Sequence, residues 1–275
     1  MQNRKRLYLY LLLLIVAIVA MILLRTSMKG FRNTFMAPRD YNEIISSGEL
    51  NVVTDYNSIG LYASGDSLQG FQREMILALE KEWGIKVNLF LENSLDENLE
   101  GLLTMRYDLV ARNIPVNIKL KDTFAFTNPI TLNKQVLVQR KQEYNDSVEP
   151  IRQHLDLAGK TIRVANDSPV ILRLNNLSHE IGDTIFIVED PTYETEQLVM
   201  MVASGDIDFT VCDEKMAIRL AKVLPEIDIE TDISFTQLES WSVRKDSPVL
   251  LDSLNSWLDR FKTTPAFKRI YRKYY

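Results

Sequence analysis

The sequence predicts an α/β protein with two lobes and a cleft between them. Residues 104–113 and 204–213, 100 positions apart, read alike. In each copy an apolar helix passes through a turn to an aspartate, Asp108 or Asp208, and then into a short β-rich run that ends on a polar residue. A strand flanked by helices is the unit of a parallel sheet, and ligands of such sheets bind beyond the carboxyl ends of the strands. Two such units facing each other would form a cleft.

The N-terminal segment predicts a membrane anchor or a signal peptide over residues 1–30. Residues 7–24 carry no charge and lie between basic residues. At ~1.5 Å per residue this run measures roughly 27 Å, close to the ~30 Å hydrocarbon core of a bilayer. Small residues lie inside the run and bulky ones follow, which favours an uncleaved anchor over a cleaved signal peptide. Basic residues before the run place the N-terminus in the cytoplasm and the folded body outside.

The first half of the body alternates between strand and helix. A linker is expected over residues 31–40, and the fold begins near Tyr41. Helical spacing after Phe71 ends at Gly84, a residue suited to the left-handed conformation that closes a helix. The expected elements are a strand over 50–54, a loop over 59–69, a helix over 71–83, a strand over 85–91, and the helix and strand of the first copy.

A polar segment, residues 140–153, is the expected crossing to a second lobe. This places residues 41–138 and 235–275 in the first lobe and 139–234 in the second. The last two helices are expected to return to the first lobe. The expected elements are a strand over 161–165, a helix start at 167–169, a strand over 185–188, a helix over 194–203, an extended run over 234–243, and helices over 248–262 and 265–274.

Composition and charge exclude several classes of function. The chain is 46% hydrophobic and 25% charged, as in ordinary globular proteins. A net charge of −5 with scattered basic residues argues against nucleic acid as a partner. The single cysteine, Cys212, excludes an internal disulfide and is expected to be buried. His154 and His179 have no partner at metal spacing, and no catalytic or cofactor-binding motif is present, so we expect no metal, no cofactor and no enzyme activity.

The ordered landmarks of the body resemble the periplasmic solute-binding proteins of family 3, many of which bind amino acids. The resemblance covers roughly residues 48–275 and implies two α/β lobes that are joined by two crossings and close on a ligand. The layout is most similar to the solute-binding module of membrane-bound lytic transglycosylases, without the catalytic domain that would begin after Tyr275. The landmarks are GELNVVTD at 48–55, GF at 70–71, RYDLV at 106–110, FTNP at 126–129, LAGK at 157–160, GDID at 205–208, Asp213, VRKDSP at 243–248 and IYRKY at 270–274.

Strand ends and a helix start supply most of the candidate ligand-binding residues. Asp55 and Tyr56 follow the first strand, and Asn113 closes the strand of the first copy. Asp167 and Ser168 stand at a helix start, where free backbone amides attract anions; simple helix capping is the alternative.

The resemblance supplies the remaining candidates. Asp213 matches the aspartate that takes the ammonium group of the ligand in this family. The arginine that commonly holds the ligand carboxylate is missing, because Asn117, Ile118, Lys119 and Leu120 occupy its stretch. Asn117 and Lys119 are therefore the candidates there, with Lys119 as a point charge.

The expected function is capture of a small polar ligand, such as an amino-acid-like solute, a peptide or a cell-wall fragment, for transport or sensing. An ABC permease or a peptidoglycan enzyme is the expected partner, and the expected location is the periplasmic face of the cytoplasmic membrane. The alternative location is the periplasm after signal cleavage. Two other functions stay open: a non-catalytic or truncated lytic-transglycosylase-like regulator of peptidoglycan turnover, and a partner-binding module with a vestigial cleft.

Overall fold

A computed structural model describes residues 39–275, so the expected segment 1–30 and its apolar run 7–24 lie outside the described residues, as does most of the linker. Within residues 39–275 no helix is both long enough and apolar enough to cross a bilayer. The described residues form one compact unit, Arg39–Tyr275. It begins with helix α2 (Tyr41–Ser47), which Asp40 caps through its side chain.

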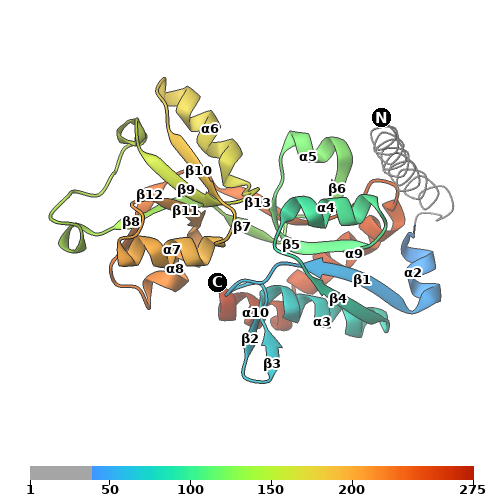
Figure 1. Cartoon of the computed structure of the whole chain (residues 1–275). Coiled ribbons are helices and arrows are strands. Elements are labelled where there is room, and N and C mark those ends of the chain that lie inside the picture. Colours follow the sequence, from blue (N-terminus) through green and yellow to red (C-terminus); the bar gives the residue numbers. More distant parts are fainter. Residues whose placement is uncertain (1–38) are drawn as a thin grey trace, which may run out of the picture. The chain divides into compact units, whose positions relative to one another are not determined.

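The first lobe is built on a six-stranded sheet (Figure 1). Strands β4, β1 and β5 run parallel, and β13 is antiparallel to β5. The last helices, α9 and α10, pack in the core of this lobe. The strands, in order across the sheet, are β4 (Lys86–Leu91), β1 (Glu49–Thr54), β5 (Leu109–Pro115), β13 (Gln237–Arg244) and β6 (Phe124–Phe126), and β7 (Thr131–Asn133) also pairs with β13.

The second lobe repeats this plan. Strands β9 and β10 pair in parallel, and β8 is antiparallel to both β11 and β12. A hydrogen bond of 3.0 Å from the Arg163 amide to the Phe209 carbonyl brings β9 beside the start of β11. The order β10-β9-β11-β8-β12 therefore matches β4-β1-β5-β13-β6. The strands are β8 (Gln135–Arg140), β9 (Thr161–Ala165), β10 (Phe186–Asp190), β11 (Thr210–Asp213) and β12 (Ile227–Asp232).

The sequence repeat is a structural repeat. The carbonyl of Gly101 accepts the amide of Arg106 at 2.9 Å, and the carbonyl of Met201 accepts the amide of Asp206 at the same distance. Between them, Met105 (φ 59°) and Gly205 (φ 88°) both adopt the left-handed conformation. Each helix therefore ends in the same kind of turn and delivers the chain into a strand beside the first strand of its lobe.

Helices cover both faces of each sheet. Alternate strand residues point to opposite faces, so Val52 packs with α3, α9 and α10 whereas Val53 packs with α4. In the second lobe, Val211 faces the cluster under α6 and Cys212 faces α7 and α8, where it is buried as expected. The helices are α3 (Phe71–Trp83), α4 (Leu95–Leu103), α5 (Ile118–Thr123), α6 (Val170–Ile181), α7 (Thr195–Ser204), α8 (Glu214–Ala221), α9 (Pro248–Lys262) and α10 (Pro265–Tyr274).

Two local expectations differ from the structure. The loop expected over residues 59–69 contains a hairpin, β2 (Tyr62–Ser64) and β3 (Ser67–Gln69), which Gly65 turns with a φ of 57°. The polar segment 140–153 is not a crossing, because β8 before it already pairs with β11 and β12 of the second lobe. It forms a surface excursion with a short 3-10 helix, Gln142–Tyr144.

The strand pairing places the first crossing elsewhere, because Lys134 joins β7 to β8. The second crossing joins β12 to β13 over residues 233–236, a range that includes the boundary expected between residues 234 and 235. In place of the boundary expected at residues 138 and 139, we propose residues 39–133 and 237–275 for the first lobe and 135–232 for the second.

Candidate functional site

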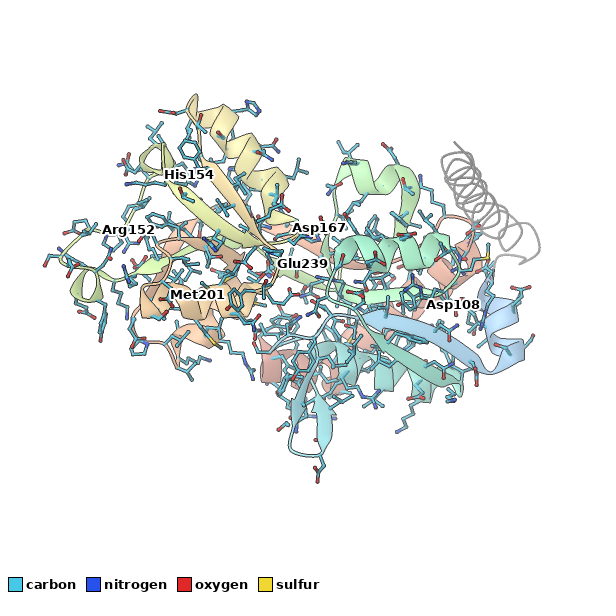
Figure 2. All side chains as sticks on the ribbon, in the orientation of Figure 1. Asp108, Arg152, His154, Asp167, Met201 and Glu239 are labelled. Atoms are coloured by element: carbon cyan, nitrogen blue, oxygen red, sulfur yellow. The ribbon has the colours of Figure 1, made fainter. Side chains whose placement is uncertain are left out.

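A cavity of about 450 Å³ lies between the two lobes. Its walls come from the loop after β1, from β5 and from Tyr275 after α10 on one side and from β11, α7 and the start of α6 on the other. One crossing borders it, since Asn133 and Gln135, on either side of Lys134, both line the cavity. Figure 2 shows Glu239, on β13, in the region where the lobes meet, and Asp108 within the first lobe. A volume of this size suits a small-molecule ligand.

Five of the eight predicted binding residues line this cavity: Asp55, Tyr56, Asn113, Ser168 and Asp213. Both residues that end the repeat are therefore brought to one site, Asn113 from the first lobe and Asp213 from the second. Among the described residues, no group of three or more His, Cys, Asp or Glu side chains is placed to hold a metal ion.

The other three predicted residues do not line the cavity. Asn117 caps α5, where its side chain accepts the Leu120 amide at 2.9 Å. Lys119 is exposed on the same helix. Asp167 is exposed at φ 53°, and its side chain accepts a hydrogen bond from Asn166. Helix capping and turn formation account for Asn117 and Asp167, and their proposed binding roles have no support from this placement.

Trp241 and the two histidines have structural surroundings. Trp241 is fully buried, and its indole nitrogen donates to Gln72. His154 faces the carbonyl of Asp232 at 2.6 Å, and His179 is exposed on α6. Neither histidine lines the cavity.

Arg112 is a cavity residue that the sequence analysis did not single out. It lies on β5 next to Asn113, and its side chain is 14% exposed. One guanidinium nitrogen donates to the Asn93 carbonyl at 2.8 Å, and another lies 3.4 Å from the Asp55 carboxylate. A guanidinium therefore lies at the cavity, although Leu120 occupies the position where the family commonly has the arginine that holds the ligand carboxylate. The sequence signal that could have found Arg112 is its position in the first copy of the repeat, immediately before Asn113.

Negative charge dominates the electrostatics around the cavity. Burial first, and then the Asp55 carboxylate, raise the pKa of Asp213 to about 6, while Arg112 opposes this shift. Burial first, and then Asp213, raise the pKa of Glu239 to about 8 against hydrogen bonds from Thr131 and Asn133. Each shift means that the ionised carboxylate is disfavoured in its buried surroundings. A cationic group beside Asp213 would relieve that cost.

Contacts between the lobes lie along the rim of the cavity. The Ser58 amide, in the loop after β1, donates to the Glu196 carboxylate on α7 at 2.7 Å. The Arg219 guanidinium on α8 lies 5.3 Å from the ring centroid of Tyr62 on β2. Met216 of α8 packs against the first-lobe core. These contacts join elements of opposite lobes.

A family model for bacterial extracellular solute-binding proteins, family 3, matches residues 50–275. The chain belongs to this family. Its two-lobe fold is shared with solved proteins. Holo ArgBP from T. maritima superimposes with a TM-score of 0.69 at 22% identity, covering 85% of this chain and 99% of that one. The solute receptor for L-cysteine of Neisseria gonorrhoeae gives a TM-score of 0.74 at 17% identity, covering 86% and 93%.

Curated relatives of this family-3 chain carry the name membrane-bound lytic murein transglycosylase F. The protein from Desulfosudis oleivorans is 27% identical over 233 residues, which are 85% of this chain and 50% of that protein. The protein from Saccharophagus degradans is 27% identical over 206 residues, 74% of this chain and 40% of that protein. The chain thus spans about half the length of the curated relatives it matches, and the resemblance to the solute-binding module of lytic transglycosylases is confirmed.

Proposed function

We propose that this protein captures a small polar ligand with a cationic group between its two lobes. The observation that carries the proposal is that opposite charges from opposite lobes reach one cavity, Arg112 from the first lobe and Asp213 from the second. An ammonium group beside Asp213 would stabilise its ionised form. Arg112 offers a guanidinium to a carboxylate or carbonyl of the same ligand. Amino-acid-like solutes and short peptides have this pair of groups.

Cell-wall fragments are the second candidate class of ligand. The relatives named membrane-bound lytic murein transglycosylase F favour this class, since their names point to murein and the part of them that matches this chain includes its two lobes. A peptide from peptidoglycan carries amino and carboxyl groups like those of a free amino acid. Binding would then inform a peptidoglycan enzyme, whereas an amino-acid ligand would be delivered to an ABC permease. Both roles place the body in the periplasm, held by residues 7–24 or released after cleavage.

A thermal-shift screen of the full chain tests the proposal and separates the ligand classes. A ligand that binds only the folded state raises the melting temperature by mass action. The panel contains L-amino acids, dipeptides and muropeptides. A rise with one class identifies the ligand type, with muropeptides supporting the cell-wall role. No rise with any compound at millimolar concentration contradicts capture of a small polar ligand and favours a partner-binding module with a vestigial cleft.

A further inference from the structure

A chain of hydrogen bonds leads from the core of the first lobe to the cavity. The Trp241 indole nitrogen donates to the Gln72 side-chain oxygen at 2.8 Å. The Gln72 side-chain nitrogen donates to the Asn113 oxygen, and the Asn113 nitrogen donates to the Tyr275 hydroxyl, both at 2.8 Å. Trp241 and Gln72 are 0% and 2% exposed, so water does not compete at that end. Gln72, Asn113 and Tyr275 line the cavity.

The direction of this chain follows from chemistry. An indole nitrogen can only donate a hydrogen bond. Gln72 must therefore turn its oxygen toward Trp241 and its nitrogen toward Asn113, which in turn presents its nitrogen to Tyr275. The Tyr275 hydroxyl accepts that bond, and its own proton is left to donate elsewhere. Among the described residues this hydroxyl makes one hydrogen bond, in which it accepts from Asn113, and it donates to no protein acceptor.

The opposite wall presents acceptors. Asp213 and Gln135 are directly paired across strands β11 and β8, so their side chains lie on the same face. Both line the cavity, and the buried Gln135 side-chain oxygen has no hydrogen-bond partner among the described residues. The second lobe thus provides a carboxylate and a free amide oxygen. The first lobe provides a hydroxyl proton and the Arg112 guanidinium.

We propose that Tyr275 is a specificity-determining residue whose hydroxyl proton selects ligands with a carboxylate or carbonyl oxygen at the first-lobe wall. This inference rests on the proposed capture of a small polar ligand and adds its orientation: the acceptor end faces the first lobe and the cationic end faces Asp213. Burial raises the pKa of Tyr275, so its hydroxyl keeps the proton at neutral pH. Asn113, predicted as a ligand contact, acts here as a positioning residue for Tyr275.

Paired probes test the recognition role. L-arginine and L-lysine are titrated by calorimetry against the full chain, beside agmatine and cadaverine, which lack the carboxylate. Tyr275→Phe is expected to weaken the amino acids about 10- to 100-fold, the loss for a hydrogen bond to a charged group, and to leave the two amines unchanged. Tyr271→Phe, one helical turn before Tyr275 and outside the cavity lining, is the matched control and should change neither class.

Equal effects of Tyr275→Phe on both members of a pair, or no effect on either, would overturn the recognition role while leaving ligand capture intact. Failure of all four probes to bind the wild type would contradict capture of amino-acid-like ligands together with this role.

The direction of the hydrogen bond at the Tyr275 hydroxyl has a separate test that needs no ligand. Tyrosine Raman doublets differ between donating and accepting hydroxyls, so the difference spectrum of wild type and Tyr275→Phe should show an accepting hydroxyl. In the Asn113→Asp variant, compared with the same variant carrying Tyr275→Phe, the Tyr275 hydroxyl should become a donor to the new carboxylate. A Tyr275 hydroxyl that only donates in the wild type would refute the proposed direction.

Discussion

At the scale of single residues, the two aspartates of the repeat have different roles. Asp108 is 1% exposed, accepts the Asn51 amide at 3.0 Å and lies 3.4 Å from the Arg244 guanidinium, which is itself 3% exposed. Asp208 is 77% exposed and lies 3.9 Å from Arg140. The sequence shows the repeat but cannot show this difference, because it depends on which partner the fold brings to each aspartate.

Asp108→Asn is therefore expected to destabilise the protein by about 3–5 kcal/mol, because it leaves the Arg244 charge buried without a full counter-charge. Asp208→Asn is the matched control and should change the free energy of unfolding by less than about 0.5 kcal/mol, since an exposed ion pair contributes little. Urea denaturation of both variants measures the difference. Similar losses of unfolding free energy in the two variants would show that the burial of Asp108 does not determine its contribution to stability.

The candidate site was predictable only in part, for reasons that also lie in single residues. Asp55 was predicted because strand ends in an α/β sheet gather at one edge, and Asp213 because it matches the family aspartate and ends the strand of the second copy; both line the cavity. Arg112 was missed because it lies inside an apolar strand. The sequence alone does not show whether an arginine at such a position reaches into a cavity or lies on the surface. Tyr275 was missed because its contacts with Asn113 join positions 162 residues apart.

At the scale of elements, periodicity and helix-ending signals gave most boundaries. Strand β9 (Thr161–Ala165) and helices α9 and α10 have the predicted bounds. The first crossing was misplaced because it is a single residue, Lys134, with no compositional signal, whereas the long polar segment after β8 has one. Hairpin β2–β3 was missed because its short strands lack apolar alternation.

The rim contacts between elements predict a change in lobe separation. Glu196→Ala removes the acceptor for the Ser58 amide, and Arg219→Ala removes the cation above Tyr62. A hydrogen bond to a charged group and an exposed cation–π contact together stabilise by roughly 2–4 kcal/mol, enough to shift an open–closed equilibrium more than tenfold. The double variant should show a larger radius of gyration without ligand in small-angle X-ray scattering.

Arg269→Ala, an exposed arginine on α10 within one lobe, is the control for this measurement and should leave the radius of gyration unchanged. An unchanged radius in the double variant as well would mean that the rim contacts do not hold the lobes together.

At the scale of the whole molecule, the buried carboxyls make stability depend on pH. The folded-state pKa of Glu239 is about 8 against an ordinary 4.5, and that of Asp213 is about 6 against 3.8. Because the folded state holds these protons more tightly than the unfolded state, the free energy of unfolding should fall as the pH rises from about 4 to 8. Above pH 6 the remaining slope belongs mainly to Glu239.

Glu239→Gln should therefore flatten the fall between about pH 6 and 8, which urea titrations at a series of pH values would show. The Asp213→Asn variant should keep that upper slope and lose part of the slope below pH 6. If the wild type and Glu239→Gln have parallel profiles above pH 6, Glu239 does not titrate in this range.

The central claim, that both lobes hold one ligand, is tested most directly by calorimetric titration of the panel compound that gives the largest thermal shift. The proteins compared are the wild type, Arg112→Gln from the first lobe, Asp213→Asn from the second, and the exposed Asp208→Asn as control. We predict that each cavity variant weakens binding about tenfold or more and that the control binds like the wild type. Loss of affinity in a variant of only one lobe, or in neither, would contradict capture between the lobes.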